Sequence, residues 1–156
     1  MEELFASAVR DLEAGRLAEA EEKFYRHLVA HPQDAMAHNK LGVIRAQQHD
    51  YAAAKELFAK ALALDSRCVH ALNNLGNIAR EEGDLEAAKS CYLKAIAIDP
   101  DYSVPHNNLA VVYKQQNKYA DFVRELKLAR RLELRAKLNP ERKTLRQALA
   151  DLWRRR

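Results

Sequence analysis

The chain has 156 residues, about the length of one domain, of which 48% are hydrophobic and 31% charged. Four glycines, four prolines and two cysteines exclude collagen-like, low-complexity and disulfide-framework proteins. The net charge of +4 is uneven, because residues 123–156 hold 12 Lys and Arg against 4 Asp and Glu, whereas residues 1–122 hold 14 against 18. The acidic start Met1-Glu2-Glu3 does not resemble a secretory signal, and no apolar run reaches the roughly 18 residues of a membrane span, so we expect a reduced, cytoplasmic protein.

Similar segments recur along the chain at a spacing of 34 residues. Residues 37–42, 71–76 and 105–110 align in this register, as do residues 51–54, 85–88 and 119–122, and residues 17–20 extend the pattern backwards. A fixed period of this length is the signature of stacked structural repeats. The sequence therefore predicts four repeats, at 1–34, 35–68, 69–102 and 103–136, followed by a C-terminal segment.

Each repeat contains two stretches in which apolar residues recur with helical spacing, so each is predicted to be a pair of helices. The residue expected between the two helices, at position 15 of each repeat, is one that tolerates a left-handed backbone: Gly15, His49, Gly83 and Asn117. Position 8 is always small (Ala8, Gly42, Gly76 and Ala110), and we expect it to face the alanines at position 20 so that the helices cross closely (Ala20, Ala54 and Ala88).

The fourth repeat and the tail depart from this pattern. Leu134 stands where a proline would end the repeat, so the second helix is predicted to continue to about residue 138. Apolar residues at helical spacing then predict an amphipathic helix that caps the last repeat, within a C-terminal segment 137–156 (Leu145, Ala148, Leu149, Leu152 and Trp153). A basic surface element for an acidic partner, nucleic acid or anionic lipid is the alternative for this segment.

The pattern resembles the tetratricopeptide repeat (TPR) family. Repeat 3 carries the family's motif at the corresponding places: Leu72, Leu75, Gly76, Ala79, Ala88, Tyr92, Ala95 and Pro100. The resemblance implies an all-α fold, a right-handed α-α superhelix of four helix-turn-helix repeats with a C-terminal capping helix. It also implies a non-catalytic scaffold that binds a protein or peptide in a concave groove.

In this family, side chains of the first helix of each pair line the groove. Mapped onto the chain, the resemblance assigns to the groove Asn39, Lys40, Asn73, Asn74, Asn77, Arg80, Asn107, Asn108 and Lys114. The asparagines are similar to the array that grips a peptide main chain in O-linked N-acetylglucosamine transferases, and an amide both donates and accepts. The cationic residues favour an acidic ligand or a free C-terminal carboxylate. A structural origin of the asparagines remains the alternative.

Other functions find less support in the residues. The carboxylate clamp that binds chaperone tails is matched at Asn74 alone of five positions, so this ligand is disfavoured. Every glycine belongs to the repeat pattern, which leaves none for a phosphate-binding loop, and no cofactor is expected. His27 and His31 lack further metal ligands at suitable spacing, and His38 and His106 occupy a position that is normally part of the core.

No nucleophile motif is present, so we do not expect an enzyme. Two alternative functions stay open: an adaptor whose basic C-terminal helix binds nucleic acid or an anionic membrane, weakly at most, and a module that recruits substrates to an enzyme on a separate chain. Self-association also stays open.

Overall fold

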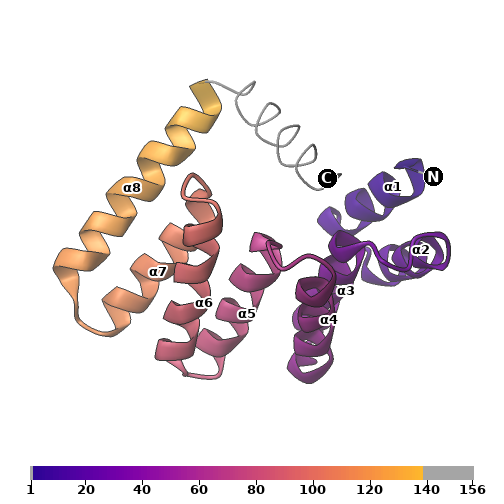
Figure 1. The fold of residues 1–156 in the computed structure, drawn as a ribbon, viewed down its shortest axis with the longest axis horizontal. Helices are drawn as coiled ribbons and strands as arrows, with labels where there is room; N and C mark the ends of the chain where they lie inside the picture. Colours follow the sequence, from indigo (N-terminus) through magenta and orange to yellow (C-terminus); the bar gives the residue numbers. More distant parts are fainter. Residues whose placement is uncertain (1, 139–156) are drawn as a thin grey trace. The chain divides into compact units, whose positions relative to one another are not determined.

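A computed structural model describes residues 2–138 of the chain. This part is all-α and contains no strand (Figure 1). Its eight helices are α1 (Glu2–Glu13), α2 (Leu17–Ala30), α3 (Ala35–Gln47), α4 (Tyr51–Leu64), α5 (Val69–Glu81), α6 (Leu85–Ile98), α7 (Ser103–Gln115) and α8 (Tyr119–Leu138). The ninth helix that the sequence predicts, the capping helix, lies outside the described residues from position 139 onward.

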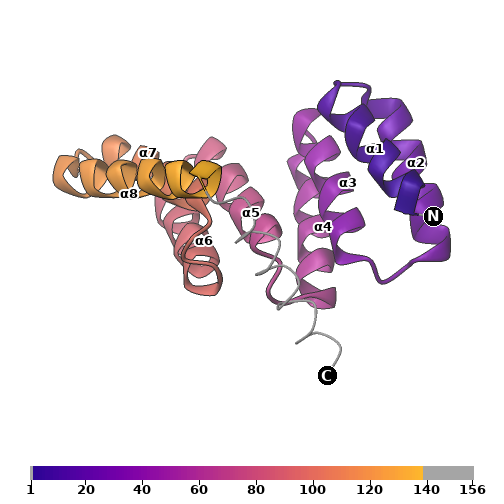
Figure 2. The same ribbon diagram turned by 90° about the horizontal axis from the view of Figure 1, so that it is seen from above.

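The helices form four antiparallel pairs, α1–α2, α3–α4, α5–α6 and α7–α8, whose members lie side by side in both Figure 1 and Figure 2. The chain divides into two compact units: unit 1 is Met1–Ile98, and unit 2 begins at Asp99. Within unit 1, α3 packs against α1 and α2, and α5 packs against α3 and α4. Each repeat of unit 1 thus buries its apolar face against the next one, as expected of a solenoid.

A left-handed residue ends the first helix of every pair, as the sequence predicts. The φ angles are +75° at Gly15, +62° at His49, +84° at Gly83 and +58° at Asn117. In each turn the amide of the following residue donates to a carbonyl five residues earlier, for example Asp84 N to Ala79 O at 2.9 Å. This bond satisfies a carbonyl that the ending helix leaves without a partner.

Aspartates begin several of the helices. The Asp34 carboxylate accepts from the amides of Met36 (2.8 Å) and Ala37 (3.1 Å) at the start of α3. Asp50 and Asp84 accept in the same way at the starts of α4 and α6, at 3.1 and 2.9 Å. These bonds cap amides that would otherwise lack acceptors, so the helix boundaries are set by local chemistry as well as by packing.

The core of unit 1 is built around one aromatic ring in each second helix. Phe24, Phe58 and Tyr92 are fully buried. A Cβ at Gly42 would lie 2.6 Å from Cε1 of Phe58, and one at Gly76 would lie 2.5 Å from Cε1 of Tyr92.

The small residue at position 8 therefore does permit a close approach, but in these two repeats its nearest neighbours are ring atoms and not the alanine at position 20 that the sequence suggested. The ring at position 24 lies one helical turn beyond that alanine on the same face of the second helix, and it reaches further toward the first helix.

Unit 2 has one long helix. Its second helix, α8, has 20 residues, whereas α2, α4 and α6 have 14 each. It continues to Leu138, the last residue that the structure describes, which confirms the extension predicted from the missing proline. Among the described helices, none combines the length and the apolar character that crossing a membrane requires.

Candidate functional site

Two asparagines form an amide pair between the first helices of repeats 2 and 3. Nδ2 of Asn74 on α5 donates to Oδ1 of Asn39 on α3 at 3.1 Å. Asn39 is only 2% exposed, and its own Nδ2 lies 3.8 Å from the Met36 sulfur. Asn74 is half-buried, and its carbonyl oxygen has no hydrogen-bond partner in the described part of the chain. Asn39 thus orients Asn74, which keeps an acceptor and a second donor for another molecule.

Next to this pair, α5 carries a second polar group centred on Tyr92. The Tyr92 hydroxyl donates to Oδ1 of Asn77 at 2.8 Å. Burial of the ring raises the pKa of Tyr92 to about 12, although the nearby Arg80 guanidinium acts in the opposite direction. The bond fixes the carbonyl end of the Asn77 amide, which leaves its amino group on the side away from Tyr92.

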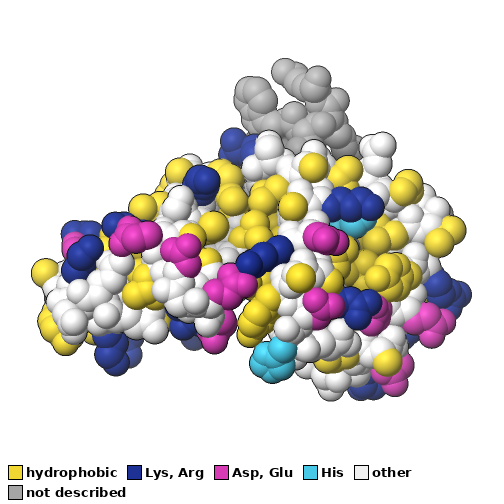
Figure 3. Space-filling model, turned by 90° about the horizontal axis from the view of Figure 1, so that it is seen from below, with side chains coloured by type: hydrophobic (Ala, Val, Ile, Leu, Met, Phe, Trp, Pro, Cys, Tyr) yellow, Lys and Arg dark blue, Asp and Glu magenta, His cyan; other side chains and the backbone are white. Residues whose placement is uncertain are grey.

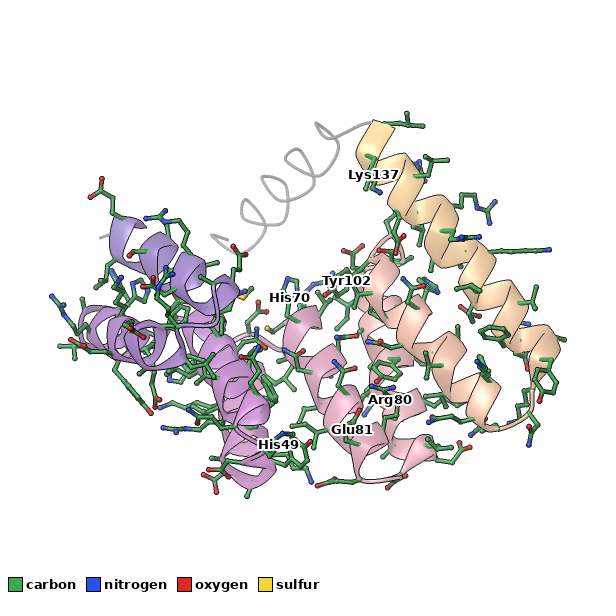
Figure 4. The ribbon with its side chains drawn as sticks, turned by 180° about the vertical axis from the view of Figure 1, so that it is seen from behind. His49, His70, Arg80, Glu81, Tyr102 and Lys137 are labelled. Atoms are coloured by element: carbon green, nitrogen blue, oxygen red, sulfur yellow. The ribbon has the colours of Figure 1, made fainter. Side chains whose placement is uncertain are left out.

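At the C-terminal end of α5, the charge of the predicted site residue Arg80 is balanced by a neighbouring acid. Arg80 pairs with Glu81 at 2.9 Å, and both residues lie near the end of α5, whereas His70 lies near its start (Figure 4). Lys40 on α3 is half-buried and has no ion-pair partner among the described residues. Of the two cationic site residues predicted in unit 1, Lys40 is therefore the one whose charge is not offset by an acid among residues 2–138.

The remaining predicted site residues occupy other settings. Asn73 is 4% exposed, so its side chain belongs to the interior. In unit 2, Nδ2 of Asn107 donates to Glu133 on α8 at 2.7 Å, Asn108 is half-buried and Lys114 is exposed. The structure thus brings Asn39 and Asn74 into contact, and it directs Asn77 and Asn107 to partners on the second helix of their own pair.

Several polar interactions were not predicted from the sequence. His106 is buried as expected, but its Nδ1 also lies 2.8 Å from Oε2 of the buried Glu125. Asp11 is 6% exposed and binds both Lys23 and Arg16, whose hydrogen bonds lower the pKa of its carboxyl. These pairs connect helices of one repeat and stabilise the fold.

Two shallow hollows on unit 1 were also not predicted. One, of about 330 Å³, has a mainly apolar lining from α2, α3, α4 and the loop between α2 and α3: Tyr25, Leu28, Val29, Pro32, His38, Leu41, Leu57 and Lys60. The other, of about 780 Å³, lies beside the end of α2: Phe5, His27, Ala30, His31, Pro32, Gln33 and Asp34. Hydrophobic side chains gather in patches between charges of both signs on the face of the molecule in Figure 3. In residues 2–138, no three His, Cys, Asp or Glu side chains are grouped so that they could hold a metal ion.

Comparison with protein families connects this arrangement to known repeats. Residues 35–68 match the model described as tetratricopeptide repeat, and residues 76–117 match a second model described as TPR repeat. The chain is a tetratricopeptide repeat protein. The matches fall on repeats 2 and 3 and the start of repeat 4, where the motif is most complete. No curated protein sequence matches the chain significantly.

Solved structures with the same fold include other TPR proteins. A crystal structure of MamA has a TM-score of 0.70 at 22% identity and covers 87% of this chain and 80% of its own. PilF of Pseudomonas aeruginosa has a TM-score of 0.75 at 28% identity, with 84% and 60% covered. The Thermobaculum terrenum O-GlcNAc transferase has a TM-score of 0.67 at 27% identity, with 72% of this chain but only 22% of the transferase covered.

The TPR chain is therefore similar to the repeats of such a transferase. A TPR fold generally serves as a scaffold for interactions between proteins, usually without catalytic groups of its own.

Proposed function

We propose that this TPR protein binds an extended peptide segment on the surface formed by the first helices of its repeats, with side-chain amides contacting the peptide main chain. The observation that carries the proposal is Asn74, because its amide is oriented by the buried Asn39 and still has an unbonded carbonyl oxygen. An amide held in this way can accept from a peptide N–H and donate to a peptide carbonyl at little additional entropic cost.

The burial of the other asparagines divides the predicted site into two roles. Asn39 and Asn73 are nearly inaccessible, so in the proposal they position their neighbours and do not touch the ligand. Asn74, Asn77 and Lys40 in unit 1 supply the contacts. On α7 of unit 2, Asn108 and Lys114 stand at the corresponding repeat positions, and we propose that they contact a peptide in the same manner.

The charges favour an acidic peptide or one with a free C-terminal carboxylate. Lys40 and Lys114 have no ion-pair partner in the described part of the chain, whereas the charge of Arg80 is offset by Glu81. We therefore expect Lys40 and Lys114 to contribute more to the binding of an acidic ligand than Arg80 does.

The proposal can be tested with a peptide selected from a random library against the wild-type protein. Asn74→Ala should weaken its binding about fivefold or more, since a hydrogen bond to a neutral group is worth about 1 kcal/mol. Gln33→Ala, which removes an exposed amide from a loop, is the matched control and should leave the affinity unchanged. Circular dichroism would verify that both variants keep their fold.

Main-chain recognition makes a sharper prediction. Replacing single amides of the peptide by esters removes one N–H at a time and keeps every side chain. One ester should weaken binding to the wild type but have no further effect on Asn74→Ala, because the two changes remove the same bond. If all esters bind equally well to the wild type, the asparagines do not hold the main chain and the proposal is wrong.

A further inference from the structure

The long helix α8 has a clearly defined inner side. Glu125, Ala129 and Leu132 are its buried residues, and their spacing of four and three places them on one face. Besides the small Ala120 at the start of the helix, the opposite face carries six residues that are all exposed and fall within a sector of about 100° at 3.6 residues per turn. We call this set the outer face of α8: Val123, Lys127, Arg130, Arg131, Leu134 and Leu138.

The outer face is positively charged and carries no acid. Lys127, Arg130 and Arg131 have no ion-pair partner within residues 2–138, unlike Arg124, which lies 2.8 Å from Asp121. The three acidic residues of α8 are all engaged elsewhere, because Asp121 pairs with Arg124, Glu125 with His106 and Glu133 with Asn107. Lys137, near the end of the helix in Figure 4, adds a further exposed cation beside this face.

Large apolar side chains lie between these cations. Val123 is 43% exposed, Leu134 58% and Leu138 77%. Single exposed apolar residues are ordinary. Three on one helix face, next to cations without an ion-pair partner in residues 2–138, form a surface that a partner with both apolar and acidic groups would cover. The two leucines lie in the part of α8 that extends beyond the length of the other second helices.

The charge selects among the molecules that could cover this face. Residues 139–156 of the chain carry six Lys and Arg against two Asp and Glu, so they would bring like charge against Lys127, Arg130 and Arg131. A lipid surface favours a continuous apolar stripe, which the cations between Val123 and Leu134 interrupt. Nucleic acid would leave the leucines unused, and the outer face offers no aromatic side chain for stacking on bases.

We infer that the outer face of α8 binds an acidic, amphipathic helix of a partner protein. Carboxylates spaced three or four residues apart on that helix pair with Lys127, Arg130 and Arg131, which span a little more than one turn of α8. Apolar side chains on the same face of the partner pack against Leu134 and Leu138. This surface lies on unit 2 and is independent of the asparagines that carry the proposed peptide binding.

The test uses the full chain and a synthetic, fluorescently labelled helical peptide that carries Glu and Leu on one face. The wild type should bind this peptide, and the affinity should fall steeply as salt is raised, because exposed charges are screened. A matched peptide with every Glu replaced by Lys should not bind. Failure of the acidic peptide to bind the wild type at ~100 μM, a concentration that detects even weak interfaces, would overturn the inference.

Variants of α8 locate the binding surface. The double variant Lys127→Glu/Arg131→Glu should weaken binding of the acidic peptide about tenfold or more, since it replaces attraction by repulsion. Lys60→Glu/Lys94→Glu makes the same change of charge at exposed lysines of α4 and α6 and should bind as the wild type does. Equal losses in the two double variants would show a nonspecific effect of net charge and refute the assignment to α8.

The apolar half of the surface has its own test. Leu134→Ser/Leu138→Ser keeps all charges, and because both side chains are exposed the melting temperature should not fall. Binding of the acidic peptide should nevertheless weaken several-fold, whereas a purely electrostatic contact would be unaffected and would contradict the inference.

Three further results would assign the surface to another ligand and overturn the inference. In the first, the protein binds phosphatidylserine vesicles more tightly than the acidic peptide, and in the second it binds a DNA duplex more tightly. In both, the vesicle or DNA binding is lost in Lys127→Glu/Arg131→Glu. The third is a tenfold gain in peptide affinity on deletion of residues 139–156, which would mean that the chain's own tail covers the face.

Discussion

The contact between Gly76 and Tyr92 makes a strong prediction about stability. A Cβ at residue 76 would lie 2.5 Å from Cε1 and 2.8 Å from Cδ1 of the Tyr92 ring. Carbon atoms normally approach to about 3.5 Å, so Gly76→Ala requires the ring and the first helix to move apart by roughly 1 Å. The ring has little room to move, because it is fully buried and its hydroxyl is bonded to Asn77.

Two opposing terms determine the size of the effect of Gly76→Ala. Alanine is favoured over glycine within a helix by about 1 kcal/mol, whereas overpacking a close-packed interior costs about 1–3 kcal/mol. The difference is a net loss of up to about 2 kcal/mol in the free energy of unfolding, and the immobile ring places Gly76→Ala near the upper end of that range. Gly42→Ala is the matched comparison, because its Cβ meets the Phe58 ring at 2.6 Å. Phe58 has no hydroxyl to hold it, so the loss there should be smaller.

Urea denaturation followed by far-UV circular dichroism would measure both variants. At this chain length the expected loss corresponds to a melting temperature lower by roughly 2–4 °C per kcal/mol. If the loss of stability in Gly76→Ala exceeds that in Gly42→Ala, the bonded Tyr92 hydroxyl accounts for the difference between the two variants. If Gly76→Ala were as stable as the wild type, the close contact would not limit the residue at position 8.

Three further sets of substitutions probe the fold. Gly83→Ala should destabilise by about 1–2 kcal/mol even though no atom lies within 4 Å of its Cβ, because its φ is +84°, and Gly83→Asn should cost less; urea titrations would compare them. The pKa of the Asp11 carboxyl is lowered in the folded protein. Its contribution to stability is therefore present above the unfolded pKa of about 4 and is lost as the pH falls through the folded pKa. Urea midpoints measured between about pH 2 and 6 should depend less on pH in Asp11→Asn than in the wild type. His106→Leu should cost about 3 kcal/mol because it removes the closer partner of the buried Glu125, which then keeps only Arg124 at 3.3 Å. The double variant with Glu125→Leu should recover most of that loss in thermal melts.

The sequence predicts best the features that depend on a fixed position of the 34-residue repeat. The four left-handed residues follow from the residue type at position 15, and the helix pairs follow from the spacing of apolar residues. The length of α8 follows from Leu134, which stands where a proline would stop the helix. These features depend on local backbone preferences, which a sequence displays directly. Their agreement across repeats removes the ambiguity that a single motif would leave.

The candidate site was harder to predict, because burial depends on how neighbouring helices pack. The resemblance placed Asn39, Asn73 and Asn74 on one surface, yet the first two are buried and only Asn74 is half-buried. The pair His106 and Glu125 could have been found, since positions 4 and 23 hold His and Glu together in repeat 4 alone. The Tyr92–Asn77 bond has no such signal, because either residue could have faced elsewhere.

The polar pairs of unit 2 connect its stability to its surface chemistry. Where repeat 3 has Leu72 and Cys91, repeat 4 has His106 and Glu125, and Asn107 binds Glu133 across the same two helices. Holding α7 to α8 in this way uses both of the glutamates that α8 contains, and Asp121 is used by Arg124. Because no acid of α8 itself remains to neutralise the outer face, the interactions that fix this helix pair also leave Lys127, Arg130 and Arg131 available for an acidic partner.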